Sequence, residues 1–167
     1  MSNKMTKILL ILILLLALGL RVYRLDEVPP SISWDEAAVG YNAWTIANYG
    51  RDEHGKLFPL YFRSFGEGKN PVDVYLTALS SKLLGLSEFS TRLPAALFGV
   101  LNVVLLYFLS KFFFNNKLIS LTAAIFLAIS PYNLHFSRFN HEANFALFFL
   151  MLGILLFLKS QENKRLL

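Results

Sequence analysis

Long apolar runs alternate with short charged segments along this chain. Four uncharged runs stand out, and they cover residues 8–20, 93–110, 118–137 and 143–158. A helix needs about 20 residues to cross a hydrocarbon core of about 30 Å. The middle two runs meet that length, and the outer two meet it when flanking Lys and Arg side chains extend to the interface. The pattern predicts an all-α membrane protein with about four spans, at about 5–24, 92–112, 117–136 and 142–159.

The first run supports two interpretations. Lys4 and Lys7 precede an Ile/Leu-rich core that ends in Ala17-Leu18-Gly19, which is also typical of a cleavable signal peptide. We expect an uncleaved anchor, because flanking residues extend the run to the length of a span. Both interpretations orient the chain in the same way.

Charge placement predicts which side of the membrane each segment faces. With the N-terminus in the cytoplasm, the inner segments hold seven basic residues and a single acid, Glu162, whereas the other ten acids lie outside. An excess of Lys and Arg on the cytoplasmic side is the usual arrangement. We therefore expect an integral protein of the cell membrane, with both termini cytoplasmic and the long loop 25–90 extracytoplasmic.

Composition agrees with a membrane protein and excludes other classes. Hydrophobic residues make up 55% of the chain and charged residues 16%, which is more apolar than a soluble domain of this length needs. No cysteine is present, so a disulfide framework and a thiolate metal site are excluded. The net charge of +5 lies at the ends of apolar runs rather than in a basic stripe, so no nucleic-acid partner is expected.

The loop 25–90 contains two helical patterns. Ser33 and Glu36 have the spacing of a capping box, and Gly50 can end the helix that they begin. Pro71 can begin a second helix, because its missing N–H costs nothing at the first position. The apolar positions of this second helix are Val72, Tyr75, Leu76, Leu79, Leu83 and Leu86. We expect both to be amphipathic helices at the membrane surface, joined by a connecting loop.

Asp35 and Glu36 are the first candidates for chemistry. Acids in the first turn of a helix stabilise it by about 0.3–1 kcal/mol each, and Glu36 can close the capping box, so both can be purely structural. Alternatively, a carboxylate held at the membrane surface can act as a general base on an acceptor hydroxyl. Because adjacent helix positions do not face each other, we expect Asp35 to face the reaction. Glu36 would then divide its role between capping and contact with an acceptor or a metal.

Two basic residues are candidates for binding a phosphate. Lys69 directly precedes a helix start, where backbone N–H groups already favour an anion. Arg138 lies between two apolar runs, and its guanidinium fork suits phosphate. The structural alternatives are an exposed loop lysine and an arginine paired with Glu142 one helical turn on. Arg92 is expected to be an interfacial anchor rather than a ligand.

The evidence for a metal or cofactor site is weak. His135, His141 and Glu142 occur within one short segment, but their spacing matches no tight metal-binding motif. No cofactor is assigned, and a divalent metal is left open. His141, Glu142 and Arg92 are retained as further candidate site residues.

Several motifs follow one another along the chain. They are Asp35-Glu36, Lys69-Asn70-Pro71, Leu84-Gly85-Leu86-Ser87-Glu88 with Arg92-Leu93-Pro94 and Gly99, and Ser130-Pro131 with Ser137-Arg138. Their order and spacing resemble those of polytopic C-type glycosyltransferases. The resemblance is closest to the superfamily of dolichyl-phosphate-mannose protein mannosyltransferases and aminoarabinose transferases, and it extends over nearly the whole chain.

This resemblance implies transfer of a sugar, with inversion, from a polyprenyl-phosphate donor to an unknown acceptor on the extracytoplasmic face. It implies that Asp35 is the catalytic acid of the first loop and that Lys69 and Arg138 handle the phosphate. Glu142 lies near a position where relatives often carry a second acid. Relatives usually have many more spans, so we expect a missing C-terminal half or a second chain. The alternative is a non-catalytic four-span subunit or a truncated, inactive fragment.

Overall fold

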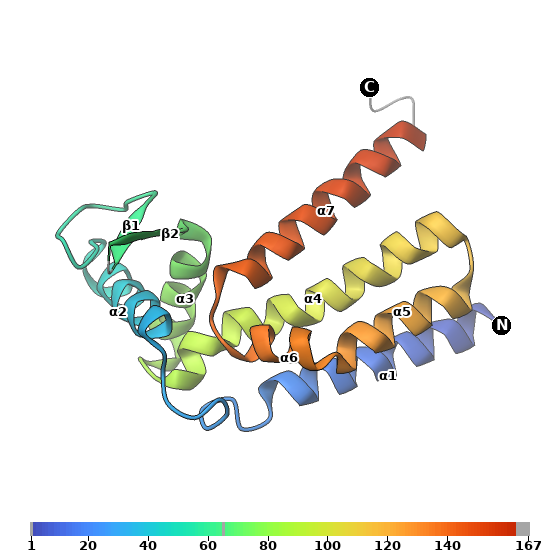
Figure 1. The fold of residues 1–167 in the computed structure, drawn as a ribbon, viewed down its shortest axis with the longest axis horizontal. Helices are drawn as coiled ribbons and strands as arrows, with labels where there is room; N and C mark the ends of the chain where they lie inside the picture. Colours follow the sequence, from blue (N-terminus) through green and yellow to red (C-terminus); the bar gives the residue numbers. More distant parts are fainter. Residues whose placement is uncertain (1, 65, 163–167) are drawn as a thin grey trace.

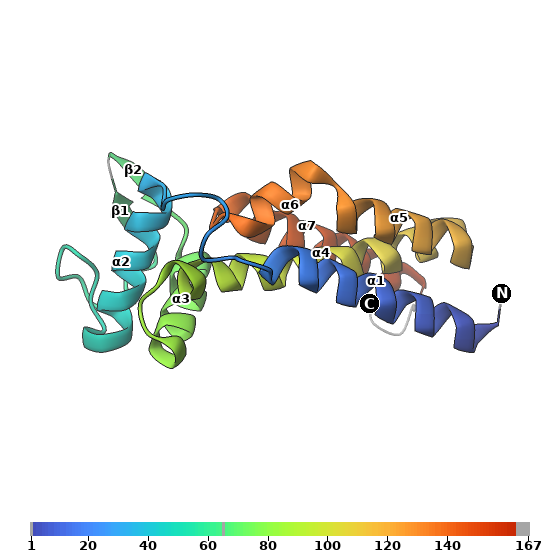
Figure 2. The same ribbon diagram turned by 90° about the horizontal axis from the view of Figure 1, so that it is seen from below.

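The structure is a computed structural model that describes residues 2–64 and 66–162, and helices make up most of it (Figure 1). The elements are α1 (Asn3–Val22), α2 (Trp34–Tyr49), β1 (Phe62–Ser64), β2 (Glu67–Lys69), α3 (Pro71–Leu84), α4 (Glu88–Phe114), α5 (Lys117–Ile129), α6 (Pro131–Arg138) and α7 (Glu142–Glu162). The predicted all-α membrane class is confirmed, with one small hairpin added. In Figure 2, α2, α3 and the hairpin lie together at one end of an elongated helical bundle.

Within the described residues, three helices are long and apolar enough to cross a membrane, namely α1, α4 and most of α7. Helices α5 and α6 pass the same test only as a pair, and they are bent by 56° relative to each other. The span predicted at about 117–136 therefore corresponds to a bent pair of helices, which can be either one broken span or a re-entrant loop. Pro131 lacks an N–H, and the residue before a proline is driven out of the helical region. Ser130 accordingly has a ψ of 120°.

The two helices of the loop 25–90 begin as predicted. The Ser33 hydroxyl accepts a hydrogen bond from the Glu36 N–H at 3.2 Å, and Glu36 Oε2 accepts one from the Ser33 N–H at 3.1 Å. Gly50 ends α2 in the left-handed conformation, with φ of 65°. Pro71 occupies the first position of α3. Local capping chemistry thus fixes where this part of the chain becomes helical.

Helix α3 turns its leucines away from the protein. Leu79 and Leu83 are 59% and 74% exposed, whereas the buried face consists mainly of small and polar residues such as Thr77 and Ala78. Small side chains let α3 pack closely on α2 and α4. An outward leucine row is what a helix lying in a membrane surface presents to lipid.

The segment between α2 and α3, predicted as a plain connecting loop, contains an antiparallel hairpin of β1 and β2. Phe62 of β1 is buried, and its ring meets the Tyr75 ring of α3 edge-on at 5.7 Å. Lys69 of β2 is the strand partner of Phe62. The buried ring therefore fixes the hairpin against α3 and places Lys69 beside the start of α2.

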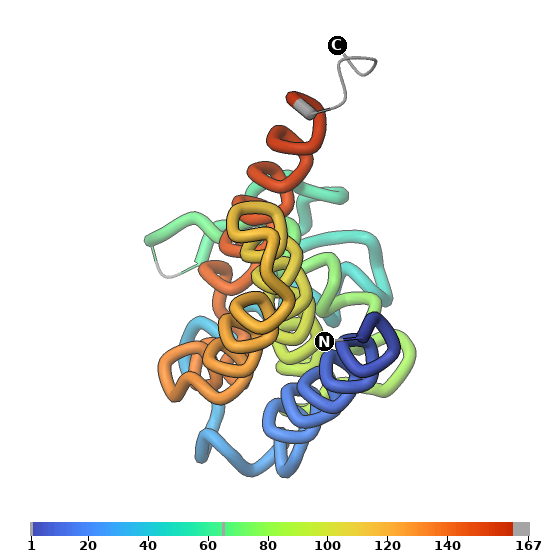
Figure 3. Tube along the Cα trace, turned by 90° about the vertical axis from the view of Figure 1, so that its right-hand side faces the viewer, coloured from blue at the N-terminus to red at the C-terminus, as the bar shows by residue number. Residues whose placement is uncertain are grey.

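Helices α1, α4 and α6 meet at Gly99 of α4. Figure 3 shows the bundle end-on. A Cβ atom at Gly99 would lie 2.6 Å from Ser137 Cβ and 2.7 Å from Arg21 Nε. Arg21 was expected to reach the interface from the end of the first run, but its side chain is fully buried. It donates to the carbonyl oxygen of Ala128 at 3.1 Å and to Asn133 Oδ1 at 2.6 Å. Glycine at position 99 leaves the space that this arginine fills.

We expect Gly99→Ala to destabilise the fold by about 1–3 kcal/mol, because the added methyl overpacks the contact with Arg21 and Ser137. Gly153→Ala is the matched control, since a Cβ there meets nothing within 4 Å. The measurement is the thermal unfolding midpoint of each variant in detergent micelles. Equal midpoints for the two variants would show that the close approach at Gly99 is not tight.

Candidate active site

Asp35 and Lys69 form an ion pair between the first turn of α2 and the end of β2. Lys69 Nζ bonds to Asp35 Oδ1. The Asp35 side chain is 44% exposed and the Lys69 side chain 12% exposed, so the carboxylate can be reached from solvent while the ammonium is largely enclosed. The structure therefore brings together two residues that the sequence singled out separately.

Lys69 lies among three carboxylates. Burial by itself lowers its pKa, but the hydrogen bond and charge of Asp35, together with the charges of Glu67 and Glu142, raise the pKa above its ordinary value overall. Glu67 Oε2 lies 3.9 Å from Lys69 Nζ. The lysine is therefore a permanent cation at neutral pH, which is the state that binds an anion.

The start of α7 joins this cluster through Glu142. Asn70 donates to Glu142 Oε2 from its side chain at 2.8 Å and from its backbone N–H at 3.3 Å. The pairing of Glu142 with Arg138, considered as a structural alternative, is absent from the described residues. Glu142 instead connects α7 to the Lys69-Asn70-Pro71 segment, so the loop 25–90 and the segment between α6 and α7 meet at one place.

Asp73 also belongs to the cluster, and the sequence analysis did not select it. It is buried in the first turn of α3, where its carboxylate accepts a hydrogen bond from the Val74 N–H at 2.8 Å. Burial raises its pKa to about 6, and the negative charge of Glu142 adds to the shift. An acid two residues after Pro71 is the only signal in the sequence, and by itself it indicates an ordinary helix-capping charge.

Arg92 is fully buried, so its prediction as an interfacial anchor is wrong. Its Nε donates to Glu36 Oε1 at 2.8 Å. The other guanidinium nitrogens donate to backbone carbonyl oxygens of the segment before α2, at Leu25 (3.1 Å), Pro29 (3.0 Å) and Ser31 (2.7 Å). The chain between α1 and α2 folds around this one side chain, and its carbonyls point inward to receive the donors.

Glu36 is buried and bonded on both oxygens. Besides Arg92 and the Ser33 N–H, it accepts the N–H of Asn140 at 3.3 Å. Asp35 and Glu36 thus point in different directions, as adjacent helix positions do. Glu36 has no access to an acceptor in this arrangement, and it fixes the helix start that carries Asp35.

Arg138 lies apart from the Asp35–Lys69 pair. Its guanidinium donates to carbonyl oxygens at the end of α1 and just beyond, including Leu20 (2.6 Å), Tyr23 (2.8 Å) and Val28 (2.9 Å). A cation at the C-terminal end of a helix satisfies carbonyls that have no intrahelical partner. Arg138 therefore stabilises the backbone of the segment that follows α1.

His141 is engaged within its own segment. Its Nδ1 accepts the N–H of Ala143 at 3.1 Å, and its ring stacks on Phe139 at 5.8 Å. In the part of the chain that the structure describes, no group of three or more His, Asp or Glu side chains is placed to hold a metal ion.

Long apolar helices, with a polar cluster on the segments between them, define an integral membrane protein. The family model described as dolichyl-phosphate-mannose-protein mannosyltransferase matches residues 68–167, more than half of the chain, and the chain belongs to this family of membrane glycosyltransferases. Comparisons with curated proteins and with solved structures found no match. Lys69, Asp73 and Glu142 lie inside the matched region, whereas Asp35 and Glu36 precede it.

We expect Arg92→Met to lower the free energy of unfolding by about 3–5 kcal/mol, because Glu36 is left as a buried charge without its partner. Arg24→Met is the matched control, since Arg24 pairs with Glu27 at the surface, where such pairs contribute little. Thermal unfolding in detergent compares the two. A midpoint for Arg92→Met no lower than that of Arg24→Met would contradict the central role of the buried pair.

Asp73 should make stability depend on pH. Its pKa is raised in the folded protein, so the folded state binds a proton between pH 3.8 and about 6 that the unfolded state does not, and stability falls as pH rises through that window. Asp73→Asn should therefore stabilise the protein more at pH 7.5 than at pH 4.5, by about 2 kcal/mol. Unfolding midpoints of both forms at the two pH values test this, and a difference independent of pH would refute it.

Proposed function

We propose that this protein transfers a sugar from a polyprenyl-phosphate donor to an acceptor hydroxyl on the extracytoplasmic face of the membrane, with Asp35 as the general base. The observation that carries the proposal is the Asp35–Lys69 ion pair on the loop between α1 and α4. The family to which the chain belongs supports the donor class, because its name specifies dolichyl-phosphate mannose. The clustering of basic residues on the other side of the apolar helices supports the orientation.

In the proposed reaction, an oxygen of Asp35 takes the proton from the acceptor hydroxyl as that hydroxyl attacks the anomeric carbon. The bond between the anomeric carbon and the phosphate oxygen breaks, and polyprenyl phosphate leaves with the electron pair. Attack opposite the leaving group inverts the configuration. The ammonium of Lys69 stabilises the negative charge that develops on the departing phosphate.

Donor binding and base activation are coupled in this scheme. Without the donor, Lys69 is bonded to Asp35. The phosphodiester of the donor carries a negative charge and competes with Asp35 for the same ammonium. Donor binding therefore frees Asp35 from Lys69, so that Asp35 can accept the proton of the acceptor hydroxyl. Asp35 is then available as a base only when the donor sugar is bound.

The surrounding residues act as positioning groups. Glu36 and Arg92 fix the helix start that carries Asp35, and the bond between Asn70 and Glu142 ties the Lys69 segment to α7. We leave Arg138 out of the phosphate site, because its guanidinium already donates to the backbone at the end of α1.

We expect Asp35→Asn to lower transfer by about 10²–10⁴-fold while lowering the unfolding midpoint only slightly, since the amide keeps the shape and loses one first-turn charge but accepts no proton at neutral pH. Asp26→Asn, an exposed acid of the same loop, is the matched control. The assay follows tritium from polyprenyl-phosphate mannose into acceptors of membranes that contain the protein.

In the same assay, Lys69→Met should raise the KM for the donor, whereas Lys82→Met, an exposed lysine of α3, should not. Full transfer by Asp35→Asn would contradict its role as the base. An unchanged donor KM for Lys69→Met would remove Lys69 from the phosphate site. An absence of transfer by the unaltered protein would contradict the proposed activity of this chain with a mannose donor.

A further inference from the structure

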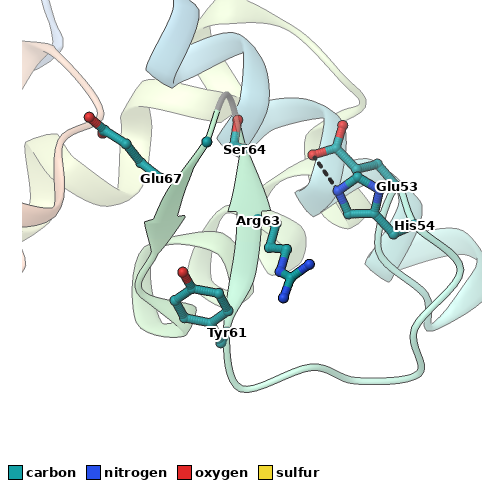
Figure 4. Close-up of a pocket in the computed structure, with 7 residues that line it drawn as sticks. Glu53, His54, Tyr61, Arg63, Ser64 and Glu67 are labelled. Carbon is teal, nitrogen blue, oxygen red and sulfur yellow. Dashed lines mark ion pairs between the residues drawn. The ribbon is translucent and has the colours of Figure 1, made fainter.

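A polar pocket lies against the hairpin. It has a volume of about 550 Å³, within the range of small-molecule sites, and Figure 4 shows the side chains around it. Its lining includes Glu53, His54, Tyr61, Arg63, Ser64 and Glu67. A second cavity of about 460 Å³ shares His54, Tyr61 and Arg63 with it. Because the two cavities share these three residues, we treat them as one site and call it the hairpin pocket.

The hairpin has two faces with different tasks. Side chains of paired residues lie on the same face of a sheet, and successive residues alternate between faces. Phe62 and its partner Lys69 therefore share the face that packs against α3 and meets Asp35. Arg63 and its partner Gly68 share the opposite face, to which Tyr61 also belongs. Arg63 and Tyr61 thus line the hairpin pocket from the face away from Lys69, whereas Ser64 and its partner Glu67, on the Lys69 face, also line it and connect it to the proposed catalytic pair.

Tyr61 forms a flat platform at this pocket. Its ring occupies the space above Gly68, where any Cβ atom would collide with the ring. The residue is 54% exposed, so much of the ring remains open to a ligand. A glycine opposite Arg63 therefore has a direct structural use, because it lets an aromatic ring lie flat on the strand.

The wall of the pocket that contains Glu53 and His54 is fixed by hydrogen bonds within the protein. Buried Asn42 clamps Glu53 twice: its Nδ2 donates to Glu53 Oε1, and its Oδ1 accepts the Glu53 N–H, both at 3.0 Å. The Asp52 carboxylate accepts the N–H groups of His54 (3.0 Å) and Lys56 (2.7 Å), which fixes the turn. A site whose polar groups are already fixed pays less entropy when it binds a ligand.

The charges of the hairpin pocket are mixed in sign. Glu53 accepts hydrogen bonds and Arg63 donates them, and His54 can do either. No residue that the structure describes accepts a hydrogen bond from the guanidinium of Arg63, which points into the pocket in Figure 4. A dedicated phosphate or cation site would carry one sign. A neutral ligand with many hydroxyl groups satisfies donors and acceptors together, and the C–H face of a sugar ring fits an open aromatic ring.

We propose that the hairpin pocket is a saccharide-binding subsite that holds the non-reacting part of a glycan acceptor. This inference rests on the proposed function and adds the chemical class of the acceptor. Glu67, at the turn end of the hairpin, lines the pocket and lies 3.9 Å from Lys69 Nζ. A glycan seated on Tyr61 can therefore extend past Glu67 toward Lys69 and bring its terminal hydroxyl to Asp35.

The test is saturation-transfer difference NMR on the whole protein in lipid nanodiscs. The probes are the methyl glycosides of common hexoses, N-acetylhexosamines and pentoses, with a serine/threonine-rich peptide as a competing class. We expect at least one glycoside to receive saturation at its ring protons. Tyr61→Ala and Arg63→Leu should each weaken its binding roughly tenfold.

Two matched variants make the outcome decisive. Tyr41→Ala removes a tyrosine of similar exposure on α2 and should leave binding unchanged, as should Asp35→Asn. Saccharide binding retained in Asp35→Asn, whether or not transfer is lost, supports the subsite independently of the catalytic assignment. The inference is overturned if no glycoside binds, if binding is unaffected by Tyr61→Ala and Arg63→Leu, or if only the peptide depends on these residues.

Discussion

The buried ion pair of Arg92 and Glu36 is the interaction on which the outer part of this protein depends. A guanidinium removed from water is strongly destabilising unless its donors are satisfied. Here they are met by Glu36 and by backbone carbonyls of the segment before α2. That requirement folds the segment into a fixed arc and anchors the start of α2 on α4. Asp35, one residue from Glu36, is thereby turned outward on a rigid support.

The same principle recurs between the helices of the bundle. Polar groups at membrane depth are costly unless they are paired, so they specify how helices fit together. Arg21 of α1 bonds to Ala128 and Asn133, and Asn102 of α4 bonds to Asn144 of α7 at 3.0 Å. Apolar packing alone would let these helices slide or rotate, whereas the polar contacts define one arrangement.

The proposed site is assembled from three separate segments. The start of α2 provides Asp35, the hairpin provides Lys69, and the start of α7 provides Glu142. Each segment is held by contacts elsewhere in the fold, such as that of the buried Phe62 ring with the Tyr75 ring for the hairpin. Because the hairpin has two faces, it can serve the reacting centre on one side and the proposed glycan subsite on the other.

The sequence by itself determined the class of protein and the ends of the loop helices. Ser33, Gly50 and Pro71 act through their own backbone and nearest neighbours, so their effects are visible in a short window. Only the tertiary structure showed that Arg92 and Arg21 are buried and that Asp73 joins the cluster around Lys69. Whether an arginine reaches water or a carbonyl depends on residues as far away as 107 positions in the chain, as for Arg21 and Ala128. No local pattern encodes such a contact.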